Sequence, residues 1–174
     1  MRKSLIATAA VATLVATALV ASASALGATS HITAASHSTK VIAFTATYSG
    51  TATTKVADNI ADIVANGSGT GTLLGASKIT GKGTGDTSAP ESGIPFQGPG
   101  TIIGVAGTKL LFTVLPTSRG TGDESGQMFS LNGKAKVTKG FGKLKNAKGT
   151  LKLTGSYDRG AGTFKIKLTG SLTA

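Results

Sequence analysis

The sequence predicts an all-β protein, an antiparallel closed β-barrel of about eight strands with no significant helix in the mature chain. Three observations support this prediction. Apolar and polar residues alternate with period two along three long C-terminal segments. The chain holds 25 glycines in 174 residues, many of them at the starts or on the apolar sides of predicted strands. It has no cysteine, so closure of the sheet, and not disulfides, has to hold a secreted chain together.

Residues 1–25 have the features of a secretory signal peptide. Arg2 and Lys3 precede an uncharged apolar stretch from Leu5 to Val20, and Ala23-Ser24-Ala25 matches the A-x-A cleavage pattern. The stretch is shorter than the ~20 residues that a spanning helix needs. We therefore expect a secreted, extracellular protein that is not a transmembrane protein. The alternative is a buried helix or a retained anchor.

Residues 26–39 are small and polar without periodicity, which predicts a disordered leader. Both histidines, His31 and His37, lie in this leader. With two histidines and no cysteine, the composition leaves no basis for a thiolate or multi-histidine metal site, and we expect no metal and no cofactor. Residues 40–174 form a single predicted β-barrel domain. The formal charge of +11 falls to +9 when Arg2 and Lys3 leave with the signal peptide.

The C-terminal strands are the clearest. Residues 129–137, 147–157 and 163–172 each place apolar residues and glycine on one side and Lys, Thr, Ser or Asn on the other. A helix would bring Lys152, Lys165 and Lys167 into its own apolar stripe, so strands with one dry and one wet face fit better.

The N-terminal half alternates less cleanly. Lys40–Tyr48 is a predicted strand, Ser49-Gly50 a turn, and Thr51–Ala57 the next strand. Asp58-Asn59 and Asn66-Gly67 are turn pairs, and the residues between them, 60–65, form either a short strand or a single helical turn. The remaining predicted strands are Thr70–Thr80, Thr101–Val105 and Thr108–Leu115. The last two are apolar on both faces, so we expect a loop or a partner chain to cover them.

The glycines have a structural explanation. Gly-x-Gly recurs at predicted strand starts, at residues 69–71, 140–142 and 160–162, but each time a strand follows where a phosphate-binding loop would need a helix. Glycines that permit positive φ angles suit tight turns and bulges. A second set lies on the apolar sides of strands, where small residues permit the sharp coiling of a closed barrel; it comprises Gly133, Gly149, Gly155 and Gly170.

One segment carries a family resemblance. Residues 139–149, KGFGKLKNAKG, resemble the G-T-G-x-F-x-x-A-x-G stretch of the dirigent and allene-oxide-cyclase barrels, which have secreted bacterial relatives of unknown function. Gly140, Gly142, Ala147 and Gly149 align, whereas Phe141 stands in place of the Thr, and Leu144 replaces the Phe. The resemblance extends over about residues 127–172, because the segments after it fit the paired last strands of such barrels.

The resemblance implies an eight-stranded antiparallel barrel, often oligomeric, with an apolar lumen. Plant members of the family steer radical coupling or cyclise an epoxide. No acid or arginine of this chain aligns with their catalytic groups, so the resemblance supports the fold more than the chemistry.

Candidate ligand-binding residues lie in two predicted loops and on two strands. The loops, residues 81–100 and 116–126, contain Glu91 and Arg119, which would join the other acids of these loops in a polar rim over an apolar lumen. Tyr48 and Tyr157 lie on apolar strand faces, and a buried phenol normally seeks a partner. These residues predict a site for a small apolar ligand. Solvated turns and ordinary core tyrosines are the alternative. Asp123-Glu124 supplies too few oxygens for a cation.

Six lysines form a predicted basic outer face on the last strands: Lys134, Lys136, Lys148, Lys152, Lys165 and Lys167. Such a charge attracts polyanions, and for a secreted protein an anionic cell-surface polymer is the expected partner. Specific nucleic-acid binding is not expected, because this face lacks aromatic residues for base stacking. The alternative is a solvated face that keeps the barrel soluble.

The sequence thus leaves two classes of function open. The first is a non-catalytic ligand-binding or cell-surface-associated barrel, which could form homo-oligomers. The second is a dirigent-like or cyclase-like enzyme that acts on a small apolar substrate in the lumen. Binding in the lumen requires an open cavity that reaches Tyr48 or Tyr157. A lumen filled by the apolar side chains of the last strands would exclude the enzyme.

Overall fold

Nine β-strands and a short 3₁₀ helix make up the computed structural model, which describes residues 39–88 and 92–174. In chain order the elements are β1 (Val41–Ala57), β2 (Ile60–Gly71), β3 (Gly75–Asp86), β4 (Ile94–Ile103), β5 (Lys109–Val114), β6 (Arg119–Gly122), β7 (Met128–Phe141), the 3₁₀ helix η2 (Gly142–Leu144), β8 (Gly149–Asp158) and β9 (Thr163–Thr173). Among these residues no helix is long and apolar enough to cross a membrane.

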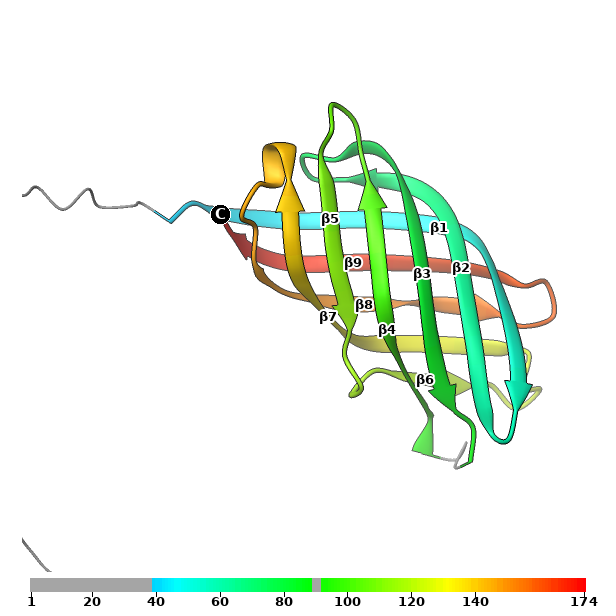
Figure 1. The fold of residues 1–174 in the computed structure, drawn as a ribbon. Coiled ribbons are helices and arrows are strands. Elements are labelled where there is room, and N and C mark those ends of the chain that lie inside the picture. The colour runs from blue at the N-terminus through cyan, green and yellow to red at the C-terminus, as the bar shows by residue number, and fades with distance from the viewer. Residues whose placement is uncertain (1–38, 89–91) are drawn as a thin grey trace, which may run out of the picture. The chain divides into compact units, whose positions relative to one another are not determined.

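The sheet closes on itself. Each strand pairs antiparallel with its neighbours in the order β3-β2-β1-β9-β8-β7-β5-β4, and the pairing of β3 with β4 joins the two ends (Figure 1). The short β6 continues the position of β5, because both lie between β4 and β7. Nine strands therefore fill eight positions around the barrel. The predicted all-β, antiparallel closed barrel of about eight strands is confirmed.

Two predicted turns are wrong. Ser49-Gly50 lies inside β1 and Asn66-Gly67 inside β2, and the two pairs face each other across the ladder, with Gly50 opposite Gly67. A Cβ at Gly50 would clash with the backbone of Asn66 and Gly67, so glycine serves here for a close approach of two strands and not for a turn. Residues 60–65 belong to β2, which excludes the helical turn.

The hairpin at Asp58-Asn59 is confirmed. Both residues have positive φ, 48° and 63°, as a two-residue type I′ turn requires. The predicted strand Thr70–Thr80, in contrast, is interrupted by a turn at residues 72–74, where Leu73 has a φ of 62°. Both Ile103 and Val105 remain largely exposed, at 53% and 48%, so no described part of this chain covers them.

The two predicted loops are largely strands. Residues 81–86 extend β3, residues 94–100 belong to β4, and β6 lies within residues 116–126. The alternation is hidden in β3 because its inward positions there are Gly81, Gly83 and Gly85, so no apolar side chain marks the inner face. Glycine and threonine in sequence look like a loop, although here they form a regular ladder with β2.

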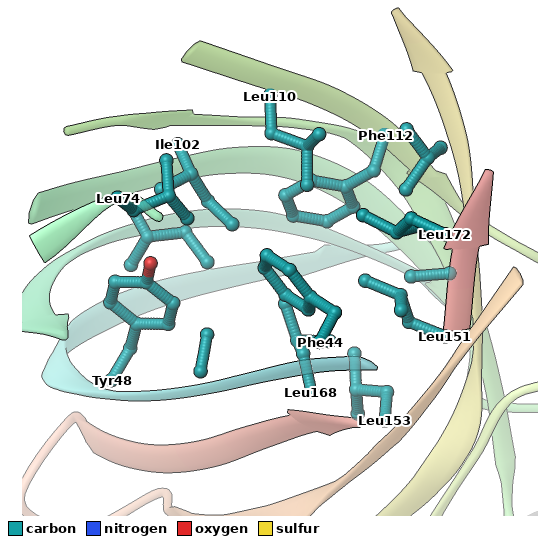
Figure 2. Close-up of a cluster of buried hydrophobic side chains, with 14 of the residues drawn as sticks. Phe44, Tyr48, Leu74, Ile102, Leu110, Phe112, Leu151, Leu153, Leu168 and Leu172 are labelled. Carbon is teal, nitrogen blue, oxygen red and sulfur yellow. The ribbon is translucent and has the colours of Figure 1, made fainter. Parts of the chain in front are cut away.

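The large apolar side chains fill one half of the barrel (Figure 2). Leu74, from the turn between β2 and β3, and Leu144, from η2, are fully buried and cover this half from its end. We call this end, where both described termini and the β2–β3, β4–β5 and β7–β8 connections lie, the closed end, and the opposite one the open end. The other fully buried large apolar residues are Phe44, Tyr48, Ile102, Leu110, Leu151, Leu168 and Leu172.

Candidate functional site

The other half of the barrel encloses a cavity of about 800 Å³. Its lining includes residues of the β1–β2 hairpin, the turn after β6 and the residue that follows β8, so the cavity reaches the open end. Five of the eight Phe and Tyr residues of the chain line it: Phe96, Phe112, Phe129, Tyr157 and Phe164. Branched aliphatic side chains complete the apolar wall: Ile63, Ile79, Val114, Leu131, Leu153 and Ile166.

Glycines keep this half hollow. At the cavity, β3 contributes Gly81 and Gly83, and β6 contributes Gly120 and Gly122, all at inward positions. A Cβ at Gly81 would meet only the carbonyl oxygen of Pro99, at 3.7 Å, so a side chain there would extend into open space. Cavity volume thus comes from the absence of side chains on one part of the wall, opposite the apolar residues of β8 and β9.

The gap between β5 and β6 is sealed by Ser118. This residue is fully buried, and its hydroxyl accepts a hydrogen bond from the backbone N–H of Lys134 at 3.2 Å. Its carbonyl oxygen accepts another from the N–H of Phe96 at 3.1 Å. Gly133 provides the space, because a Cβ there would clash with the Ser118 side chain. The wall therefore stays closed where the strand position is interrupted, and the buried hydroxyl has its partner.

Tyr157 supplies a hydroxyl to the cavity. It lies 3.1 Å from the hydroxyl oxygen of Thr54, which also lines the cavity, and the ring packs against Phe129 with centroids 6.3 Å apart. A smaller cleft of about 370 Å³ lies between β1 and the β8–β9 turn, and it shares Thr54, Tyr157 and Arg159 with the cavity. The hydroxyl pair can therefore donate or accept a hydrogen bond where a ligand in either space would lie.

Three charged residues are among those that line the cavity: Lys82, Asp123 and Arg159. The carboxylate of Asp123 accepts hydrogen bonds from the Ser125 hydroxyl at 2.8 Å and from the N–H of Gln127 at 3.2 Å. The bond from Ser125, supported by backbone N–H groups, lowers the pKa of Asp123. Asp123 thus stabilises the turn between β6 and β7. The other two, Lys82 on β3 and Arg159 at the start of the β8–β9 turn, are exposed.

Tyr48 and Tyr157, the two candidate tyrosines, lie in different halves of the barrel. Tyr48 belongs to the filled half, where its hydroxyl is 2.9 Å from that of Ser77, and burial raises its pKa while this hydrogen bond opposes the shift. It is not among the described residues that line the cavity. Tyr157 does line it, at the position that the alternation of residues 147–157 assigned to the inner face.

Of the two charged candidates, Arg119 does not line the cavity with Tyr157. Arg119 is exposed on β6, and its guanidinium donates to the carbonyl oxygens of Pro116 at 2.7 Å and Ser118 at 3.0 Å, so it stabilises the segment before β6. Glu91 lies outside the described residues. Sequence reasoning did not single out Thr54 or Arg159, although the inward phase of β1 would have indicated Thr54, six residues beyond Tyr48.

All six candidate lysines are exposed, on β7, β8, β9 and the residue before β8. Lys134 and Lys152 stand directly opposite each other on neighbouring strands. Two like charges in this position destabilise a sheet, so packing does not explain them. Beyond these lysines, at the end of β7, the ring of Phe141 lies 5.1 Å from Lys139 Nζ and 5.9 Å from Lys109 Nζ. The residues we call the basic wall are Lys134, Lys136, Lys148, Lys152, Lys165 and Lys167.

Metal-binding groups were also sought. Residues 39–88 and 92–174 hold no cluster of three or more His, Cys, Asp or Glu side chains that could bind a metal ion. The two histidines lie outside these ranges. In comparisons with family models, curated proteins and solved structures, none matched this chain.

The two glycines of β3 that line the cavity lead to a direct prediction. Gly81→Ala should leave the free energy of unfolding unchanged or raise it by about 0.4–1 kcal/mol, because the added methyl group enters open space and restricts the unfolded chain. Gly83→Ala should lower it by about 1–3 kcal/mol, because its Cβ would clash with the carbonyl oxygen of Gln97. Urea unfolding of both variants measures the difference. Equal destabilisation would contradict the described wall.

Proposed function

We propose that this protein binds a small apolar molecule in the barrel lumen without catalysing its conversion. The observation that carries the proposal is the cavity of about 800 Å³, whose wall is built from aromatic and branched aliphatic side chains and which reaches the open end. Sites for small molecules have volumes of roughly 300–1,000 Å³, with mostly apolar walls and a few polar groups. The Tyr157–Thr54 pair and Arg159 are such polar groups.

The likeness of residues 139–149 to dirigent and allene-oxide-cyclase barrels supports this proposal, because an apolar lumen is what that likeness implies. The polar groups of the cavity favour binding over catalysis. The Tyr157 and Thr54 hydroxyls are paired with each other, and Asp123 is engaged by its own turn. The dirigent-like or cyclase-like enzyme remains the alternative, with Tyr157 as its candidate acid or base. The signal peptide predicted for residues 1–25 supports a place outside the cell.

A variant whose side chain fills the lumen tests the proposal. Gly81→Leu directs an apolar side chain into the cavity, whereas Thr84→Leu places the same side chain at an exposed position of β3 that does not line the cavity. With the neutral fluorescent probe N-phenyl-1-naphthylamine, Gly81→Leu should lose at least about tenfold in affinity, because a lost contact worth 1.4 kcal/mol is a factor of ten. Thr84→Leu should bind as the unchanged protein does.

Circular dichroism of both variants provides the control for folding. Ile63→Trp fills the cavity from β2 and should also weaken probe binding. Affinity that is unchanged in both folded filling variants would refute binding in the lumen.

The basic wall supports a second candidate function, association with an anionic cell-surface polymer. Lys134 and Lys152 are held opposite each other against their mutual repulsion, which a bound polyanion would relieve. Because the basic wall lies on the outer surface, this association and ligand binding in the lumen are compatible.

Retention on immobilised polyphosphate tests this second candidate. Reversing Lys134 and Lys152 to Glu should abolish retention at moderate salt, whereas reversing the exposed lysines Lys78 and Lys82 on β3, an equal change in net charge, should weaken it less. Equal loss in the two variants would show that net charge, and not the basic wall, governs retention.

A further inference from the structure

We propose that the closed end of the barrel docks on an anionic lipid bilayer, with the open end facing away from it. The proposal concerns a surface outside the lumen, which shares Lys148 alone with the basic wall. It does not depend on whether the lumen binds a ligand.

Charge is divided between the two ends of the barrel. The chain has seven acidic residues, and all six that are described lie at the open end, in its turns or in the adjoining strand ends. Lys55, Arg119, Arg159 and Lys165, in the same turns and strand ends, offset the six acids only in part. The open end is therefore repelled by a negative surface. The six acids are Asp58, Asp62, Asp86, Asp123, Glu124 and Asp158.

The closed end carries lysines and none of the described Asp or Glu residues. Its lysines lie directly before β1, in the connection between β7 and β8, and at the adjoining ends of β7 and β5. Ala174, whose backbone N–H and C=O pair with those of Lys40, contributes at most one negative group there. We call this set the basic rim: Lys40, Lys109, Lys139, Lys143, Lys145 and Lys148.

Exposed apolar side chains complete the same end. Leu73, Ile103 and Val105, in or beside the β2–β3 and β4–β5 turns, are 38%, 53% and 48% exposed. The two turns are in contact, because the N–H of Val105 donates to the carbonyl oxygen of Leu74 at 2.9 Å. Val41, at the start of β1, is 66% exposed. Figure 1 shows both turns at the end of the barrel where η2 and the C-terminus lie.

This combination favours a bilayer over a soluble polyanion. A polyanion in water would interact with the lysines and gain nothing from Ile103 or Val105. At a bilayer surface the lysines attract anionic headgroups, and the apolar side chains are buried among the acyl chains beneath them. The ring of Phe141, between Lys109 and Lys139, is an amphipathic contact of the kind that suits this boundary.

One further feature of the closed end fits this orientation. The lumen is blocked there by Leu74 and Leu144. A ligand would therefore enter from the opposite end, which docking leaves free.

Co-sedimentation with vesicles tests the proposal. The protein should bind vesicles made of equal parts phosphatidylglycerol and phosphatidylcholine, and not vesicles of phosphatidylcholine alone. Replacing Lys143, Lys145 and Lys148 with Gln should lower the partition coefficient on the order of a hundredfold, because each lysine near an anionic surface contributes about 1 kcal/mol. Replacing Lys134, Lys152 and Lys165 removes the same charge from the side of the barrel and should have a much smaller effect.

The apolar contribution separates a bilayer from a polymer. Val105→Ser combined with Ile103→Ser should weaken binding to the anionic vesicles and leave retention on immobilised polyphosphate unchanged. Binding to vesicles that is equally sensitive to both lysine triplets would overturn the assignment to the closed end. Retention on polyphosphate without any binding to anionic vesicles would overturn the bilayer in favour of a polymer.

The absence of cysteine allows the orientation to be measured in the same vesicles. An environment-sensitive dye on Val105→Cys should shift to the blue on binding, whereas the same dye on Ala161→Cys, in the β8–β9 turn, should not. A shift at residue 161 alone would show that the open end faces the membrane.

Discussion

Closure of the sheet between β3 and β4 is the constraint on which the rest of the structure depends. Once eight strand positions form a ring, every inward side chain has to share one lumen of fixed width. In this chain the two halves of the lumen are filled to different extents. Phe44, Tyr48 and six leucine or isoleucine residues of the strands and the β2–β3 turn, with Leu144 of η2, fill one half, and glycines on β3, β4 and β6 leave the other half open.

The C-terminal strands could be predicted because their inner faces carry large side chains. Phe164, Ile166 and Leu168 alternate with Thr and Lys, and this pattern has one structural explanation. The same rule fails at β3, where Gly81 and Gly83 occupy the inner face and leave no apolar signal. The glycine-lined part of the cavity wall is thus the part of the barrel that the alternation of residues does not predict. The features that make the cavity also make its strands look like loops.

The candidate site was predictable only where side chains mark the inner face. Tyr157 was placed on it by the alternation of β8, and Tyr48 by that of β1. Whether each tyrosine lines the cavity depends on its position along the barrel axis. The alternation of apolar and polar residues indicates which face of a strand a residue occupies, and not where it lies along that axis. The position of Arg119 could not be predicted either. It follows the interruption between β5 and β6, and its guanidinium donates hydrogen bonds to backbone carbonyl groups of the segment that connects these two strands.

The open half of the lumen is an apolar cavity that exists without a bound ligand. Xenon binds in apolar cavities, because an apolar atom makes no polar contacts that would favour binding at another site. A crystal structure of the protein under xenon pressure measures this directly. We expect xenon between the glycines of β3 and β6 and the rings of Phe129 and Phe164. A lumen without xenon, in which these side chains have collapsed onto Gly81 and Gly120, would contradict it.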